Sequence, residues 1–344
     1  MSPPHSELFE EAIKVTPLTS HTYSAHLHKD WCIGNVPHGG YTAAILYRLA
    51  TTHFARSDAS PYRSKPVLPI SFQLTFVRAT QVGPATLSVE DVKFGARTST
   101  IQVTLSQDAA SKGPQTKVVG YITVSPAEAD QEGPVVSGNS TLQPIPPPGS
   151  KPDGGIDFAT LAEQGRDGPW TRFPAIPAMA VSQHLELFGA LPPSTVQERI
   201  NTTVDQWARF RPGGQTPARW TDEAVMCLLD LFPMALDRLG AMATSAWAST
   251  HDPEDKQSRP PGPFWFPTVA FNVDLKKSLP PDGAGWLHSR VVTKSFRAGR
   301  ADLGVEIFDQ NGELVAISSQ VCMVVGYERN LKNGKRTQPA QGKL

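Results

Sequence analysis

One acidic residue interrupts an otherwise apolar run in the second half of the chain. Asp230 follows the apolar residues 224–229 and precedes Leu231 and Phe232. This setting predicts a carboxylate among core-facing neighbours, where burial of an unpaired charge is costly and raises the pKa. With hydrogen-bond partners, such a group is suited to act as a general base on a water molecule. Asp230 is therefore a catalytic candidate, with a structural hydrogen bond or a solvent-facing helix position as the ordinary alternative.

A second candidate is the tripeptide His38-Gly39-Gly40, which directly precedes a helical pattern that begins at Tyr41. The N–H groups at a helix N-terminus are unpaired and lie at the positive end of the helix dipole, and glycine permits close approach by a ligand. Gly39 or Gly40 is thus expected to polarise a bound carbonyl group. The alternatives are that the glycines only permit a tight turn or close packing, and that His38 is a capping or core histidine.

Two similar runs of predicted elements position these residues. In the first half, a helix from Tyr41 to about Phe54 is followed by strand-like alternation at residues 67–78, 86–94, 99–105 and 117–124. In the second half, strand-like segments at 180–188 and 200–210 precede a helix from about Asp222 to Ala243, with Thr221 as its cap. Strand-like alternation then returns at residues 269–275, 285–295, 303–309 and 314–325.

The similarity of the halves extends to individual residues. Ser71-Phe72-Gln73-Leu74 matches Ala270-Phe271-Asn272-Val273, and Phe94-Gly95-Ala96-Arg97 matches Phe296-Arg297-Ala298-Gly299-Arg300. An internal repeat of a helix laid on an antiparallel sheet fits both halves. We therefore expect an α+β fold, a double hotdog, in which two tandem units each wrap an antiparallel sheet around a central helix. Two unrelated α+β domains are the alternative.

The predicted division of the chain follows its proline content. Prolines interleaved with glycines, serines and acids mark residues 126–170 as a linker. An N-terminal hotdog unit is expected at 1–125, a C-terminal unit that carries Asp230 at 171–328, and a polar tail at 329–344.

Composition and charge exclude several classes of protein. The 344 residues include 32 Lys plus Arg and 32 Asp plus Glu, so no net charge would attract nucleic acid or anionic lipid. The content of 39% hydrophobic and 19% charged residues indicates a folded core. Cys32, Cys227 and Cys322 are too few and too scattered for a disulfide framework or a zinc motif, and we expect buried thiols.

Targeting signals are few. We find no secretory signal and no run of about 18 apolar residues that would span a membrane. A cytoplasmic protein is expected. The C-terminal Gly342-Lys343-Leu344 differs from the peroxisomal Ser-Lys-Leu signal at one residue, so a peroxisomal location is the alternative to a chance match.

Several short motifs occur in a definite order on the repeat. They are Trp31-x-x-Gly34 before His38-Gly39-Gly40-Tyr41, then Leu228-Leu229-Asp230, Pro267-Thr268-Val269, and Gly312-Glu313-Leu314-Val315-Ala316 before Ser319-Gln320. Together they resemble the acyl-CoA thioesterase II type of double-hotdog enzymes, within the thioesterase-like superfamily. The resemblance covers about residues 20–125 and 175–327.

The resemblance implies a catalytic trio. By motif position, the family's aspartate, threonine or serine, and glutamine match Asp230, Thr268 and Gln320. It also implies hydrolysis of an acyl thioester carried by coenzyme A or a related carrier, without a metal or other cofactor. In this scheme Asp230 activates a water molecule that Thr268 and Gln320 orient.

The first half carries no such set of polar residues. Thr268 lies opposite Ile70 in the repeat, Gln320 lies opposite roughly Thr123, and no acid occurs between Gly40 and Arg56. This asymmetry is expected if two pseudo-equivalent sites have been reduced to one.

The prediction of the substrate depends on fewer residues. Phe264-Trp265-Phe266 immediately before Thr268 predicts an apolar acyl or aryl pocket with Trp265 in contact with substrate, although core aromatics are the ordinary alternative.

The competing functions are a hotdog dehydratase or hydratase, a product-releasing enzyme of a polyketide-type pathway, and a non-catalytic acyl-binding protein. A dehydratase needs a histidine paired with an acid, and His38 has no acid close to it in sequence. A homodimer is possible.

Overall fold

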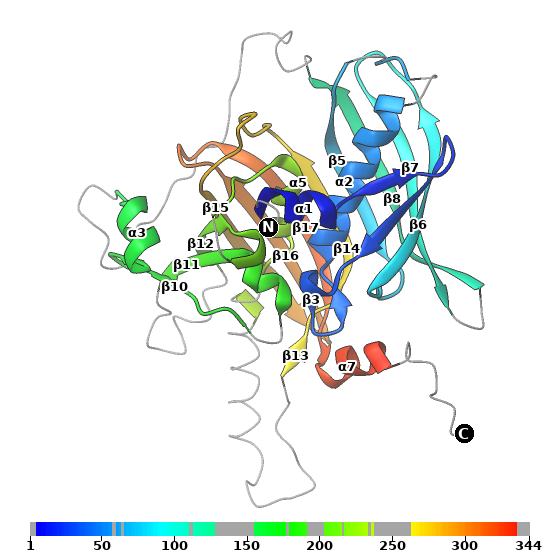
Figure 1. The fold of residues 1–344 in the computed structure, drawn as a ribbon. Helices are drawn as coiled ribbons and strands as arrows, with labels where there is room; N and C mark the ends of the chain where they lie inside the picture. The colour runs from blue at the N-terminus through cyan, green and yellow to red at the C-terminus, as the bar shows by residue number, and fades with distance from the viewer. Residues whose placement is uncertain are drawn as a thin grey trace, which may run out of the picture.

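The computed structural model describes residues 5–56, 60–62, 65–109, 113–127, 155–176, 179–190, 203–214, 217–232, 235–236 and 263–335. Its main feature is a large antiparallel sheet with the strand order β1-β2-β6-β7-β8-β5-β14-β17-β16-β15-β12-β11-β10-β9 (Figure 1). The first six of these strands in that order belong to the N-terminal half and the other eight to the C-terminal half.

The strands of the N-terminal half are β1 (Val15–Pro17), β2 (Thr22–Leu27), β5 (Val67–Phe76), β6 (Gly83–Lys93), β7 (Ser99–Ala109) and β8 (Gly113–Pro126). Those of the C-terminal half are β9 (Arg166–Asp167), β10 (Trp170–Arg172), β11 (Leu185–Ala190), β12 (Thr203–Phe210), β14 (Thr268–Leu275), β15 (Leu287–Arg297), β16 (Arg300–Phe308) and β17 (Leu314–Met323). Two small sheets pair β3 (Cys32–Ile33) with β4 (Val36–Pro37) and β13 (Phe264–Trp265) with β18 (Val325–Gly326).

The two halves join through β5 and β14, the strands that the internal repeat matches to each other. Phe72 lies opposite Val273, Leu74 lies opposite Phe271, and Gln73 lies opposite Asn272 between them. Because the repeat matches Phe72 with Phe271 and Leu74 with Val273, this pairing relates the halves by an approximate two-fold axis.

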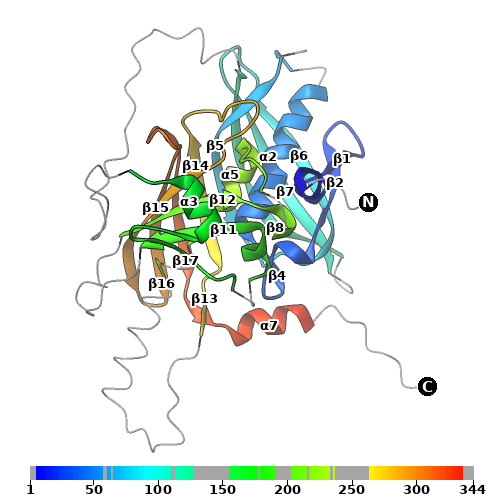
Figure 2. The same cartoon turned by 60° about the vertical axis from the view of Figure 1, so that its left-hand side comes forward.

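Each half holds one central helix. Helix α2 (Gly39–Arg56) is buried on almost all sides, and α5 (Asp222–Leu229) is buried from Ala224 onward. The two helices pack against each other, and the curved strands lie around them (Figure 2). This is the double hotdog expected from the sequence, because each helix is too apolar to face water and the sheet of its own half covers it.

Helix α5 is shorter than predicted. It begins as expected, with the Thr221 side chain accepting a hydrogen bond from the N–H of Ala224, but it ends at Leu229 rather than near Ala243. Pro233 accounts for this end, because proline has no N–H to donate to the Leu229 carbonyl and disfavours a helical residue before it. Residues 233–234 and 237–243 of the predicted helix lie outside the described residues.

The predicted strand at 180–188 is also partly wrong. Residues Ala180–His184 form a 3-10 helix, and β11 begins only at Leu185. The Ser182 hydroxyl donates to the Met179 carbonyl at 2.7 Å, and such local side-chain bonds compete with strand pairing.

The end of the segment assigned to the linker is folded. It contains α3 (Phe158–Gln164), β9 and β10, and its Leu161 and Trp170 join a small apolar cluster with Phe188, Trp207 and Trp286. Residues 128–154 of the linker lie outside the described residues.

The segment predicted as a polar tail begins with a helix, α7 (Glu328–Lys335). Asn330 on this helix is fully buried, donates to the Ile33 carbonyl at 2.9 Å and accepts from the Asn35 N–H at 2.9 Å. Helix α7 thus holds the turn between β3 and β4. The possible targeting signal at 342–344 lies outside the described residues.

All three cysteines lie in the core. Cys32, Cys227 and Cys322 are buried free thiols, as the sequence predicted. Among the residues that the structure describes, no helix has both the length and the apolar character needed to cross a membrane.

Gly40 permits the close crossing of α2 and α5. A Cβ atom there would lie 2.3 Å from the Met226 carbonyl oxygen and 2.9 Å from the Cys227 Cα. We therefore expect Gly40→Ala to lower the free energy of unfolding by about 1–3 kcal/mol through overpacking, despite the better helix propensity of alanine. Urea denaturation measures this. Gly285→Ala is the matched control, because its Cβ would have only ordinary contacts, the nearest 3.6 Å away. Equal midpoints for Gly40→Ala and wild type would contradict the packing argument.

Candidate active site

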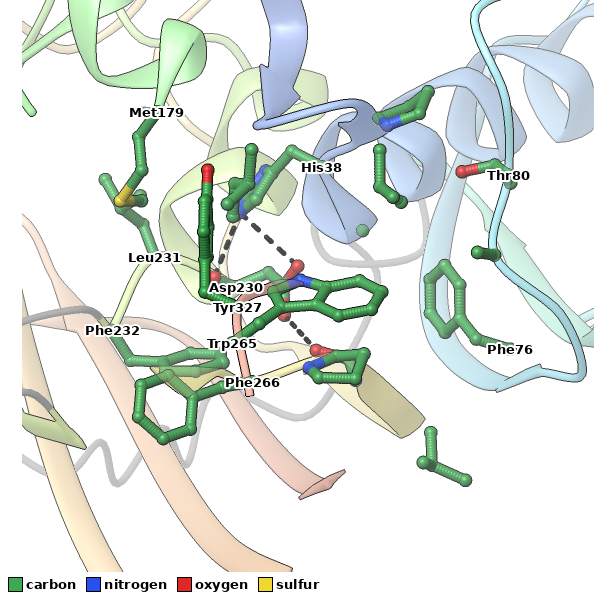
Figure 3. A pocket seen from close by; sticks show the side chains of 18 of the residues that line it. His38, Phe76, Thr80, Met179, Asp230, Leu231, Phe232, Trp265, Phe266 and Tyr327 are labelled. Carbon is green, nitrogen blue, oxygen red and sulfur yellow. Dashed lines mark hydrogen bonds and ion pairs between the residues drawn. The ribbon is translucent and has the colours of Figure 1, made fainter. Parts of the chain in front are cut away.

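A cavity of about 640 Å³ lies where the two halves meet. Residues 33, 36–39 and 76–80 of the N-terminal half line it, together with residues 230–232 and 263–269 of the C-terminal half. Most of its wall is apolar, with Ile33, Phe76, Met179, Phe232, Trp265 and Phe266 among the lining residues (Figure 3). Asp230, Thr268 and His38 line the same cavity, whereas Gln320, the third member of the predicted trio, is not among the lining residues.

Asp230 lies at the C-terminal end of α5 and is only 5% exposed. Its Oδ2 accepts a hydrogen bond from the Gly40 N–H at 2.8 Å, and its Oδ1 accepts one from the Thr268 hydroxyl at 2.9 Å. Each carboxylate oxygen is therefore held by a donor from another element, one at the start of α2 and one at the start of β14.

The close approach of α2 to Asp230 requires glycine at positions 39 and 40. A Cβ at Gly39 would lie 2.6 Å from Asp230 Oδ2, and one at Gly40 would lie 2.9 Å from Asp230 Cβ. Only residues without a side chain let the N-terminus of α2 come this close to the carboxylate. The positive end of the α2 dipole then faces the negative charge, which stabilises an anion there.

His38 is the N-cap residue of α2 and is buried. Its Nδ1 accepts a hydrogen bond from the Tyr41 N–H at 3.3 Å, which assigns the proton of the neutral ring to Nε2. This Nε2–H donates to the Asp230 carbonyl oxygen at 3.0 Å and lies 3.4 Å from Asp230 Oδ2. His38 thus has the capping role that the sequence left open, and it also holds Asp230.

Burial raises the pKa of Asp230 above its ordinary value. Proximity to His38 and the hydrogen bonds from Thr268 and the glycine N–H groups act in the opposite direction without cancelling the effect of burial. A carboxylate with a raised pKa is a stronger base, which suits it to take a proton. Burial also raises the pKa of the neighbouring thiols Cys227 and Cys322, so neither is an activated nucleophile.

Gln320 does not contact Asp230 or Thr268 through any hydrogen bond between the described residues. Its Nε2 donates to the Leu229 carbonyl at 2.5 Å and to the Ser318 hydroxyl at 3.1 Å. The Leu229 carbonyl is one that Pro233 cannot cap, so Gln320 satisfies it. Gln206 does the same for the Leu231 carbonyl at 3.3 Å. Two buried glutamines therefore fix the end of α5, where Asp230 lies.

Several residues of the cavity were not among the sequence-predicted ones. Tyr327 and Arg78 line it, as do Phe76 and Met179. Tyr327 comes directly before α7, and Phe76 ends β5, so only the path of the chain brings them to the cavity. In Figure 3 the Trp265 indole lies beside Asp230, while Phe76 faces it from across the cavity.

The chain is similar in sequence to known proteins. A family model described as Acyl-CoA thioesterase N-terminal domain matches residues 27–125, and one described as Acyl-CoA thioesterase C-terminal domain matches residues 158–324. The chain is 30% identical over 366 residues to Thioesterase-like protein TwmA of Talaromyces wortmannii, with 98% of this chain and 97% of the relative covered.

Solved structures share the fold. A protein with a hotdog fold from Alicyclobacillus acidocaldarius aligns with a TM-score of 0.63 and 18% identity, over 92% of this chain and 97% of the other. An acyl-CoA thioesterase II from Mycobacterium marinum aligns with a TM-score of 0.54 and 16% identity, over 92% and 98% of the two chains. These likenesses confirm the double-hotdog fold expected from the sequence.

Because its pKa is raised, Asp230 lowers the free energy of unfolding at neutral pH. The folded state keeps its proton at a pH where the unfolded chain has lost it, so stability falls as pH rises above about 4. In Asp230→Asn, the amide oxygen can accept from Gly40 while the amide nitrogen donates to Thr268. We therefore expect this variant to be at least as stable as wild type near pH 8, with the difference lost near pH 4. Urea denaturation across this range measures the effect, and a strongly destabilised variant near pH 8 would contradict it.

Proposed function

This chain belongs to the acyl-CoA thioesterase family, and from that premise we propose that it hydrolyses an acyl thioester with a water molecule activated by Asp230. The observation that carries the proposal is a buried carboxylate, with a pKa raised by burial, on the wall of an apolar cavity. Such a cavity excludes bulk water around an acyl chain while it leaves one base exposed to the reacting group.

Asp230 and Thr268 together provide a place for the attacking water. The Thr268 hydroxyl donates to Asp230, so its oxygen lone pairs remain able to accept a hydrogen bond. A water molecule that donates one proton to Asp230 and the other to Thr268 directs its own lone pair away from both. This water attacks the thioester carbonyl carbon as Asp230 takes its proton. The C–S bond then breaks, and the leaving thiolate receives that proton from Asp230.

In this proposal the Gly39 N–H, at the start of α2, contacts the carbonyl oxygen of the thioester. The N–H groups of both glycines interact with Asp230, and of the two Gly39 is the one that lines the cavity, so in the complex its N–H is shared between the carboxylate and the carbonyl oxygen. A backbone N–H at the positive end of a helix dipole stabilises the negative charge that develops on this oxygen.

Gln320 is in this proposal a positioning residue. The resemblance implies that it binds the water, but its amide N–H groups are committed to the Leu229 carbonyl and to Ser318, and only its Oε1 has no partner among the described residues and can accept from a water. By holding Leu229 it holds the residue before Asp230, and so fixes the direction of the carboxylate.

The acyl group is assigned to the apolar wall. Trp265 and Phe266 come directly before Thr268 in the chain, and Phe76 and Phe232 line the cavity with them. An apolar acyl or aryl group buried against these rings gains the transfer free energy of its surface.

A dehydratase or hydratase is less well supported. Folding does bring His38 within 3.4 Å of an acid, Asp230, which the sequence spacing did not indicate. However, both ring nitrogens of His38 are engaged, Nδ1 by the Tyr41 N–H and Nε2 by Asp230. A ring bonded on both sides has no free nitrogen for a proton of the substrate.

Loss of the base is expected to abolish most turnover. We expect Asp230→Asn to lower kcat for hydrolysis of acyl-CoA by about 10²–10⁴-fold, because the water loses its general base. Thr268→Ala is expected to lower kcat by a smaller factor, and Thr268→Ser to restore much of it. Thiol release from acyl-CoA and acyl-pantetheine substrates of varied acyl chain measures these rates.

The matched control is Asp222→Asn. Asp222 is a second acid of α5 with a pKa raised by burial to about 6, but it bonds to Leu279 and does not line the cavity. Its variant is expected to retain wild-type turnover. Equal rates for wild type and Asp230→Asn would reject the base, and water addition to an enoyl thioester in place of thiol release would indicate a hydratase.

The positioning role of Gln320 is tested by Gln320→Met, which keeps the shape and removes the N–H donors. We expect a loss of about 1–3 kcal/mol in the free energy of unfolding, because the Leu229 carbonyl is left buried and unpaired. We also expect kcat to fall while KM stays the same, because Asp230 loses its orientation. A stability loss with unchanged kcat would reduce Gln320 to a structural residue.

A further inference from the structure

Three side chains that are distant in sequence meet at the far end of α2 from the cavity. They are His21 in the turn before β2, His53 near the end of α2, and Asp91 on β6. His53 is 13 residues beyond Gly40, which is roughly 20 Å along a helix. Strand β2 pairs with β6 and also contacts α2, and the three elements lie side by side in Figure 2. This cluster is therefore separate from the candidate active site.

Both histidines direct a ring nitrogen at the same carboxylate. His21 Nε2 lies 2.9 Å from Asp91 Oδ2, and His53 Nε2 lies 2.9 Å from Asp91 Oδ1. One ligand atom from each residue lies within 4.8 Å of the others. Ligands at about 2.0–2.2 Å from a tetrahedral zinc ion are separated by roughly 3.3 Å, so small side-chain movements suffice to surround an ion.

The other nitrogen of each ring is held by a hydroxyl group. His21 Nδ1 lies 2.9 Å from the Ser20 hydroxyl, and His53 Nδ1 lies 2.9 Å from the Tyr23 hydroxyl. Histidines that bind metals are oriented in this way by a partner on the second nitrogen, which also fixes the tautomer.

The Tyr23 hydroxyl lies between two partners. It is 3.1 Å from the Ser20 carbonyl and 2.9 Å from His53 Nδ1, to which it can donate or from which it can accept. When the hydroxyl donates to Ser20, His53 Nδ1 carries the ring proton, and the lone pair of Nε2 beside Asp91 is available to a metal ion.

We propose that His21, His53 and Asp91 form a binding site for a divalent first-row transition metal ion, with zinc as the best match to two imidazoles and one carboxylate. The His21 side chain is 47% exposed and that of Asp91 is 23% exposed, so a water molecule completes the coordination from the solvent side. The ion links the turn before β2, strand β6 and helix α2, and its expected role is to stabilise the N-terminal half.

The proposal is tested on the untagged full-length chain after treatment with EDTA. Isothermal titration with ZnCl₂ is expected to show one equivalent bound, and Co²⁺ is expected to give the visible absorption of a four-coordinate site. Thermal unfolding should shift upward with zinc concentration and return after chelation, because an ion that binds only the folded state stabilises it.

Two substitutions test the ligands, one at an exposed residue and one that conserves the shape of the side chain. His21→Ala and Asp91→Asn are each expected to weaken zinc binding by more than about 10–100-fold, the range found even for lost outer partners of a metal site. His26→Ala is the matched control, because His26 is an exposed histidine of β2 whose ring lies 4.9 Å from that of His28. It is expected to bind zinc like wild type.

The absence of a stoichiometric zinc site in the wild-type chain would overturn the proposal and leave the cluster as a hydrogen-bonded network. Zinc affinity that is unchanged in His21→Ala, or lost in His26→Ala, would overturn it as well. None of these outcomes depends on thioester hydrolysis, so failure here and failure of the proposed function are distinguishable.

Discussion

The buried carboxylate of Asp230 imposes the main constraint on the centre of this protein. A charge that is only 5% exposed requires donors, and the fold provides them from two elements outside its own helix. The N-terminus of α2 approaches closely enough for the Gly40 N–H to bond to Oδ2, and β14 begins with the Thr268 hydroxyl on Oδ1. This contact requires glycine at 39 and 40, a helix that ends at 229, and an ordered strand start at 268.

The duplicated fold places this contact at the boundary of its halves. The approximate two-fold axis between β5 and β14 brings the central helices together, so the start of α2 meets the end of α5. The cavity opens beside that meeting point and takes its wall from both halves. Because α5 stops after two turns while α2 continues to Arg56, the two helices are no longer equivalent, and the polar groups gather at the short one.

The two ends of α2 have different chemistry for the same physical reason. A buried helix exposes unpaired N–H groups at its start, and here they face the carboxylate of Asp230. At its other end, His53 is buried with its ring between Tyr23 and Asp91. The helix dipole favours positive charge at this C-terminal end, which agrees with a cation held by the two histidines and Asp91.

The sequence alone determined the repeat, most of the order of elements and the start of α5 at Thr221, and it indicated a buried position for Asp230. These follow from periodicity and from bonds between residues a few positions apart, which a single chain segment contains in full. It did not determine that Gly40 donates to Asp230, that Gln320 turns to the Leu229 carbonyl, or that His21, His53 and Asp91 meet. Each of these contacts joins residues 38 to 190 positions apart. Only the tertiary structure decides them, because the partners of a distant polar group depend on the path of all the chain between them.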